Sequence, residues 1–102
     1  MPIISSCVPS KNARRYLAQL CKHFAHKVPV NWTETQGDVD FGVGTCRMQA
    51  SEDELRLTCS AEVDTDLERV KLVLEDHLQR FAWREKPVIE WTPGGDGGST
   101  PE

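Results

Sequence analysis

Side chains able to bind metals or transfer protons are concentrated in two stretches of this 102-residue chain. The first is Leu20-Cys-Lys-His-Phe-Ala-His-Lys27 and the second is His77-Leu-Gln-Arg-Phe-Ala-Trp-Arg-Glu85; together they contain all three histidines. Imidazole and thiolate are preferred zinc ligands, and a histidine beside arginines suits an anion. The two stretches therefore suggest either a metal site or an anion site.

The metal hypothesis draws its ligands from several elements. Cys46 and Cys59 are expected to be neighbours on the inner face of a sheet, with Cys21 on the inward stripe of a helix above them. The full set is Cys21, His23, Cys46, Cys59 and His77. Against it, the chain has no Cys-x-x-Cys pair, and free cysteines also serve as small buried hydrophobes. We therefore predict no cofactor, with a transition metal such as zinc or iron as the alternative.

The anion hypothesis combines His23 and His77 with Arg80 and Arg84 as ligand-binding residues. The simpler interpretation is a buried His77 that donates a hydrogen bond to a backbone carbonyl, beside surface arginines that pair with acids. We favour the simpler interpretation.

No constellation typical of an enzyme occurs in the sequence, which lacks a glycine-rich phosphate loop, a serine nucleophile elbow and a Walker pattern. A nucleophilic cysteine needs a thiol that is activated and open to solvent. Cys21, Cys46 and Cys59 are expected to point inward, and only the exposure of Cys7 is left open. No catalytic residue is assigned, and the sequence favours a non-enzymatic protein.

The net charge of −4 argues against general nucleic-acid binding. Residues 1–33 nevertheless hold five basic residues and no acidic one, and Lys11, Arg15, Lys22 and His26 fall on one outer side of a helical pattern.

No apolar run approaches the ~20 residues that a membrane span needs, and the first residues lack the pattern of a secretory signal. We expect a cytoplasmic protein with free thiols and with no nucleic-acid or membrane partner.

Two periodicities organise the chain. Residues 11–26 and the segment from Thr65 to about Glu85 repeat apolar residues at spacings of three and four, which predicts helices. Ser10 and a capping box at Thr65 are expected to start them. Alternating patterns predict strands at residues 3–9, 28–32, 39–41, 46–50, 55–61 and 88–91.

Turn residues predict the strand register. Two-residue turns are expected at Gln36-Gly37 and at Val43-Gly44, and a four-residue turn at 51–54. The expected cross-strand pairs are Trp32 with Phe41, Phe41 with Cys46, and Cys46 with Cys59. Every pair keeps apolar residues on one face of the sheet.

The order strand, helix, four strands, helix, strand predicts an α+β fold. We expect an antiparallel meander sheet with both helices packed on one face, which is compatible with a TATA-binding-protein-like arrangement. Residues 1–92 form the single domain, and the Gly/Pro-rich residues 93–102 are expected to be a disordered tail.

The motifs Tyr16-Leu-Ala-Gln-Leu-Cys-Lys-His-Phe-Ala-His-Lys27, Gly37-x-Val-x-Phe41 and His77-Leu-x-Arg-Phe-Ala-x-Arg-Glu85, followed by Trp91, resemble the bacterial family catalogued as domain of unknown function number 2218. The resemblance extends over residues 5–91 and implies no assigned activity and no functional residues. Some relatives look to be joined to siderophore-interacting, flavin-reductase-like proteins, which implies a weak link to iron metabolism.

The function we predict is a non-enzymatic binding or accessory module with an unknown protein partner, self-association as a dimer being left open. Trp83 is the interface candidate, because it falls off the apolar stripe of the second helix and an exposed tryptophan is a typical interface anchor. Alternatively, the helix unwinds after Phe81 and Trp83 packs under Trp91. The alternative function is a metal-binding or small enzyme-like domain that uses His23, His77 and an inward cysteine.

Overall fold

The computed structural model describes residues 2–93 of the chain. In chain order the elements are β1 (Ile3–Pro9), α1 (Ala13–Ala25), β2 (Val30–Trp32), β3 (Gln36–Asp40), β4 (Gly44–Ala50), β5 (Glu54–Ala61), α2 (Asp64–Phe81) and β6 (Thr92–Pro93).

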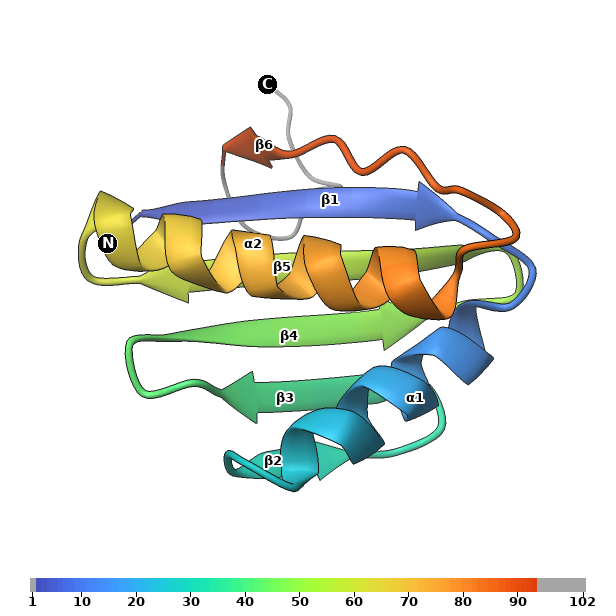
Figure 1. The fold of residues 1–102 in the computed structure, drawn as a ribbon, viewed down its shortest axis with the longest axis horizontal. Coiled ribbons are helices and arrows are strands. Elements are labelled where there is room, and N and C mark those ends of the chain that lie inside the picture. The colour runs from blue at the N-terminus through green and yellow to red at the C-terminus, as the bar shows by residue number, and fades with distance from the viewer. Residues whose placement is uncertain (1, 94–102) are drawn as a thin grey trace.

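The six strands form one antiparallel sheet in the order β2-β3-β4-β5-β1-β6. β1 pairs with β5, so the chain crosses the whole sheet through α1 before it returns strand by strand. Both helices lie on the same face of the sheet, with α2 over β4 and β5 and α1 toward β2 and β3 (Figure 1). The predicted α+β fold and its element order are confirmed.

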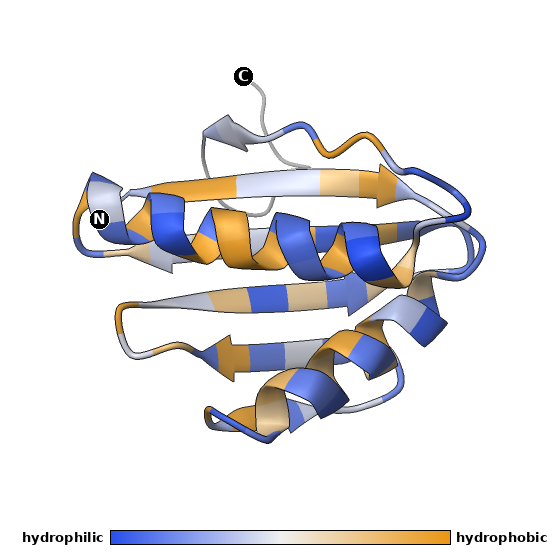
Figure 2. Cartoon of the chain, in the orientation of Figure 1, coloured by the Kyte–Doolittle hydropathy of each residue, from blue (hydrophilic) through white to orange (hydrophobic). Residues whose placement is uncertain are grey.

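The core lies between the helices and one face of the sheet. Hydrophobic and hydrophilic residues alternate along β4, and each helix carries a hydrophobic stripe (Figure 2). This alternation places every second strand residue against the helices. The largest fully buried side chains are Leu17 and Leu20 of α1, Leu74 and Leu78 of α2, and Met48, Leu55 and Leu57 of the sheet.

One of the three predicted strand registers is correct. The Ser51–Glu54 turn places Cys46 opposite Cys59, as expected. The other two are wrong, because Trp32 pairs with Gly37 and Val39 pairs with Cys46. Both errors shift a strand by an even number of residues, so each side chain keeps its predicted face.

The first wrong register comes from Gly37, which lies in β3 and not in a turn. The actual turn spans Thr33–Gln36, where Thr33 Oγ1 accepts hydrogen bonds from the backbone N–H groups of Thr35 and Gln36 at 3.3 and 3.2 Å. A Cβ atom on Gly37 would lie 2.6 Å from Cys21 Sγ. This glycine therefore allows α1 to approach β3 closely.

The second wrong register comes from Gly44, which begins β4. Gly42 and Val43 form the actual two-residue turn, closed by a 2.8 Å hydrogen bond from Phe41 N–H to Gly44 O. Gly42 has a φ of +86°, which a glycine adopts at little cost. Asp40 Oδ1 stabilises the turn by accepting from Gly42 N–H at 2.9 Å.

Both helix starts differ from the predicted caps. Ser10 Oγ accepts from Asn12 N–H at 2.9 Å, but the residue at the N-cap position of α1 is Asn12, whose side chain makes no capping hydrogen bond. α2 begins at Asp64 after Val63, and no side chain caps it, so the capping box at Thr65 is wrong. The helix thus begins one residue before the predicted start at Thr65.

The segment after α2 returns along the sheet edge. Residues 88–91 are not a strand; β6 consists of Thr92 and Pro93, which pair with β1. Trp91 Nε1 donates to Glu75 Oε2 at 2.6 Å and ties this segment to α2. Pro93, predicted to belong to the tail, is thus paired, while residues 94–102 lie outside the described residues. Within residues 2–93, neither helix has the length and apolar content needed to cross a membrane.

Candidate functional site

Two of the predicted ligand residues, His23 of α1 and His77 of α2, are in contact where the helices meet. Their ring centres are 4.6 Å apart and their planes are tilted by 49°. Both side chains are partly exposed. Because the residues belong to different helices, only the packing of α1 on α2 brings them together.

Three phenylalanines surround this histidine pair. The ring of Phe24 meets Phe41 and His77 edge-on, at 5.1 and 5.0 Å. Phe81 lies 6.0 Å from His23. Such edge-to-face contacts are favourable because ring edges are positive and ring faces negative. We call these five rings, His23, Phe24, Phe41, His77 and Phe81, the aromatic cluster.

A hydrogen bond within α2 orients His77. Its Nδ1 lies 2.7 Å from the carbonyl oxygen of Val73, one turn earlier. A carbonyl oxygen only accepts, so Nδ1 is the nitrogen that carries a proton, and Nε2 is the nitrogen left to bind a ligand. The bond to a backbone carbonyl is the one expected from the simpler interpretation of His77.

The surroundings of His23 disfavour its charged form. Partial burial, followed by the proximity of His77, lowers the pKa of His23 below its ordinary value, and the charges of Lys27, His26 and Arg80 act in the same direction. His23 is therefore mainly neutral near pH 7.

The three inward cysteines lie deeper, in the core. Cys46 and Cys59 face each other across β4 and β5, and Cys21 approaches from α1; all are buried, free thiols. Burial raises the pKa of Cys21 to about 11. Burial, and then a hydrogen bond with Cys59, raises the pKa of Cys46. The thiols of Cys21 and Cys46 are therefore protonated near pH 7 and unsuited to nucleophilic chemistry.

The five residues of the metal hypothesis do not converge on one point. Within residues 2–93, no three His, Cys, Asp or Glu side chains are placed to hold one metal ion. Cys21 and His23 are two positions apart on α1, so they point about 200° apart around the helix. The Cys21 thiol consequently points toward the sheet that carries Cys46 and Cys59, while the imidazoles lie where the two helices meet.

The arginines of the anion hypothesis are engaged elsewhere. Arg80 forms an exposed ion pair with Asp76 at 3.4 Å. The guanidinium of Arg84 lies over the ring of Trp83, 5.1 Å from its centre. The structure therefore brings His23 and His77 together but does not bring Arg84 to them.

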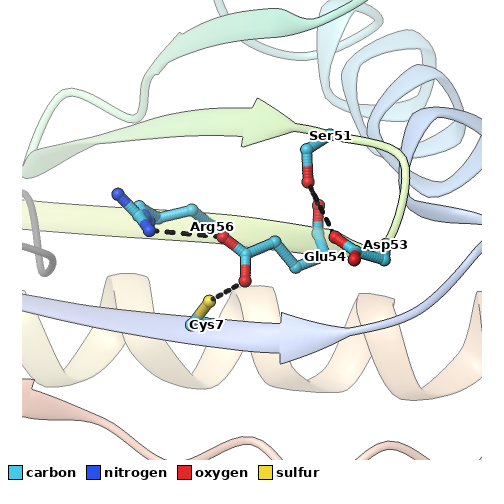
Figure 3. A network of polar contacts seen from close by, with 5 residues as sticks. All are labelled: Cys7, Ser51, Asp53, Glu54 and Arg56. Carbon is cyan, nitrogen blue, oxygen red and sulfur yellow. Dashed lines mark hydrogen bonds and ion pairs between the residues drawn. The ribbon is translucent and has the colours of Figure 1, made fainter.

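The thiol whose exposure the sequence left open, Cys7, lies on the open face of the sheet (Figure 3). Its Sγ donates to Glu54 Oε1 at 2.9 Å, and Glu54 also pairs with Arg56 at 3.2 Å. Partial burial and then the Glu54 carboxylate raise the pKa of Cys7. Cys7 is thus accessible but protonated, which makes it a weak nucleophile near pH 7.

Sequence reasoning missed a polar contact that joins the start of α1 to the segment after α2. Glu85 Oε2 accepts hydrogen bonds from Tyr16 OH and Asn12 Nδ2, both at 2.6 Å. These bonds, Tyr16 first, lower the pKa of Glu85 below its ordinary value of 4.5. The available signal was Tyr16 at the edge of an otherwise apolar helix stripe, since a buried tyrosine hydroxyl needs a partner.

A Tyr16→Phe substitution is expected to lower the free energy of unfolding by about 1 kcal/mol at pH 7, a modest value because Glu85 is exposed. The stabilisation from the lowered Glu85 pKa is present above pH 4.5 and is lost as the pH falls through the pKa of the folded state. Urea unfolding of both proteins between pH 7 and pH 3 should show the difference shrinking as the pH falls below 4.5. A pH-independent difference would contradict this account, and Glu52→Gln, at an exposed turn position, is the control.

Trp83 lies beside this contact in a groove between α1 and the end of α2. The groove has a volume of about 290 Å³ and includes Arg15 and Gln19 of α1, together with Phe81 and Arg84. We call it the Trp83 groove. The helix ends at Phe81 and not near Glu85, as the alternative required, but Trp83 is 62% exposed and is not packed under Trp91.

The open face of the sheet carries a second, larger depression of about 600 Å³. Its polar side chains largely satisfy one another: Arg47 pairs with Asp38 at 3.1 Å, and the hydroxyls of Thr45 and Ser60 are 2.9 Å apart. It offers hydrogen-bonding groups without a free cluster of like charges.

Residues 5–92 match the family described as "Uncharacterized protein conserved in bacteria (DUF2218)". The chain belongs to this family. A solved relative of this DUF2218 protein is the NMR structure of PA4090 from Pseudomonas aeruginosa, which is 35% identical in sequence. The two superpose with a TM-score of 0.78 over 90% of this chain and 96% of that chain. No curated protein matches the present chain.

Membership in the DUF2218 family confirms the resemblance seen in the sequence motifs. It brings no assigned activity, because the family is described as uncharacterised. The function of the protein must therefore be inferred from its own surfaces, of which the Trp83 groove and the aromatic cluster are the most distinctive.

Proposed function

We propose that this DUF2218 protein is a non-enzymatic interaction module that binds an acidic segment of a protein partner in the Trp83 groove. The observation that carries the proposal is the 62% exposure of Trp83 beside Arg15 and Arg84. Tryptophan and arginine dominate the energetics of protein interfaces.

The exposed tryptophan is held in place by its neighbours. Arg84 stacks on one side of its ring, and the 2.6 Å contact between Glu85 and Tyr16 anchors the following residues to α1. A preordered aromatic side chain loses little conformational entropy when a partner covers it. The groove is therefore suited to bind a side chain of a partner.

Charge supports an acidic partner. Neither Arg15 nor Arg84 belongs to the ion pairs found within residues 2–93, nor do the other basic residues of the first 33, Lys11, Arg14, Lys22 and Lys27. Unpaired cations around an apolar centre attract and orient carboxylates of a partner.

The thiols support a non-enzymatic role in a reducing compartment. Raised pKa values keep Cys7, Cys21 and Cys46 protonated, so the chain holds no thiolate nucleophile at these positions. All four cysteines are free, which fits the cytoplasm that we propose as the location of the protein.

Site-specific photo-crosslinking in the native bacterium tests the proposal. A photoreactive phenylalanine analogue at position 83 is expected to give a discrete protein adduct, whose contact segment, located by mass spectrometry, is rich in Asp and Glu. Trp83→Ala should then weaken binding to the purified partner about 30-fold or more, as expected for an interface anchor worth about 2 kcal/mol.

Trp32 provides a matched control, since it is also exposed, at 38%, but lies on the edge strand β2. The analogue at position 32 should not give the same adduct, and Trp32→Ala should bind normally. An adduct with a second copy would identify the partner as the chain itself. Identical adducts at both positions, or none at position 83, would remove the proposal.

The iron or siderophore setting implied by the family resemblance stays a prediction. It would gain support if the crosslinked partner were an iron-handling protein, and the Trp83 groove does not depend on it.

A further inference from the structure

The contact between His23 and His77 forms a candidate binding site that is independent of the Trp83 groove. The two imidazoles come from separate helices and meet at a partly exposed surface, with a centre-to-centre distance of 4.6 Å. Two imidazoles that converge at a surface provide a chelating pair for a transition metal ion.

The distance matches what one metal ion requires of two imidazoles. With metal–nitrogen distances of about 2.0–2.1 Å, each ring centre would lie about 3.2 Å from the ion. If the angle between the two metal–nitrogen bonds lies between a right angle and the tetrahedral angle, the ring centres are about 4.5–5.2 Å apart. The observed 4.6 Å lies within this range, and the 49° tilt shows that the rings are not stacked face to face.

His77 already has the hydrogen bond that metal-binding histidines usually make. Nδ1 donates to the carbonyl oxygen of Val73 at 2.7 Å, which leaves the lone pair of Nε2 free. A partner on the second nitrogen fixes both the tautomer and the orientation of a ligating ring.

The surrounding charges determine which ions suit the pair. Lys27 is a basic neighbour of His23, and so is Arg80, which pairs with Asp76 at 3.4 Å. Positive neighbours oppose a dication, so only ions with a strong preference for imidazole nitrogen remain, and Cu²⁺ leads that order. The same neighbours favour an anion in the coordination positions that two histidines leave open.

We propose that His23 and His77 together bind one divalent transition metal ion, Cu²⁺ in preference to Zn²⁺, with the remaining positions open to water or to an anionic ligand. The aromatic cluster holds the pair: Phe24 packs beneath His77, and Phe81 flanks His23. The buried cysteines take no part.

Metal titration of the untagged protein tests this site. Calorimetry with Cu²⁺ and with Zn²⁺ is performed in a Cys7→Ser background, because Cys7 is the exposed thiol. We expect one Cu²⁺ per chain and weaker Zn²⁺ binding, with His23→Gln and His77→Gln each reducing Cu²⁺ affinity at least about tenfold. His26→Gln is the matched control, an exposed histidine of the same region, and should keep the full affinity.

Electron paramagnetic resonance of the Cu²⁺ complex of the Cys7→Ser protein, with both histidines intact, keeps the test decisive if a histidine variant does not fold. Hyperfine coupling to two imidazole nitrogens is expected. Absence of Cu²⁺ binding, coupling to fewer than two nitrogens, or unchanged affinity in the folded His23→Gln or His77→Gln protein would overturn the proposal. So would an equal loss of affinity in His26→Gln.

Discussion

Phe24→Ala is expected to lower the free energy of unfolding by about 3–5 kcal/mol, the usual range for removal of a buried aromatic ring. Phe24 is 4% exposed and contacts the rings of Phe41 and His77 at 5.1 and 5.0 Å. Its loss would leave a cavity between α1, α2 and the turn after β3. Urea unfolding followed by circular dichroism measures the change.

The same substitution should disturb the histidine pair, because Phe24 supports His77 from beneath. In the folded fraction, nuclear magnetic resonance is expected to show His23 and His77 more mobile than in the wild type. Phe81→Ala is the matched control, since its ring belongs to the aromatic cluster but is only partly buried. We expect it to cost clearly less than Phe24→Ala; equal losses would show that burial does not determine the contribution of each ring.

Gly44→Ala is expected to destabilise the protein by about 2–3 kcal/mol, as overpacking of a close-packed site does. An added Cβ would lie 2.6 Å from the backbone oxygen of Ser60 and 2.9 Å from Val70 Cγ2. The first contact is with the neighbouring strand β5 and the second with α2. A strand backbone within a sheet yields little, so relief of the clash requires α2 or the start of β4 to move. Thermal and urea unfolding should both report the loss.

Gly42→Ala separates steric from conformational effects at the same hairpin. A Cβ on Gly42 would meet no atom within 4 Å, but the residue has a φ of +86°. The expected cost is about 1 kcal/mol, from the backbone alone. If Gly42→Ala proved more costly than Gly44→Ala, turn conformation and not close packing would explain the glycines of this hairpin.

The placement of side chains on the inner or outer face was predictable from the sequence because it depends on local periodicity. The alternation that includes Cys46, Met48 and Leu57 placed each of them correctly in the core. Two strand registers were wrong, but the side chains kept their predicted faces, because a shift by an even number of residues preserves the side of the sheet. Local pattern determines orientation, and turn geometry determines register.

Glycine shows where local interpretation is insufficient. Gly37 and Gly44 were both predicted to form turns, as glycine often does. In the structure both lie in strands, where a Cβ would be 2.6 Å from Cys21 Sγ or from Ser60 O. In each case the atom that excludes a Cβ belongs to another element of the fold. The residues next to the glycine in the sequence therefore do not reveal it.

The fold class, the order of the elements, the buried stripes of both helices, the inward position of Cys21, Cys46 and Cys59, and the family could all be predicted before the structure was known. Each follows from residue periodicity or from motifs contiguous in the chain. The 4.6 Å contact of His23 with His77 could not be predicted in this way. The same is true of the exposure of Trp83 and of the contact between Glu85 and Tyr16. These contacts depend on how α1 packs against α2 and the sheet, which is set by the shapes of many side chains at once.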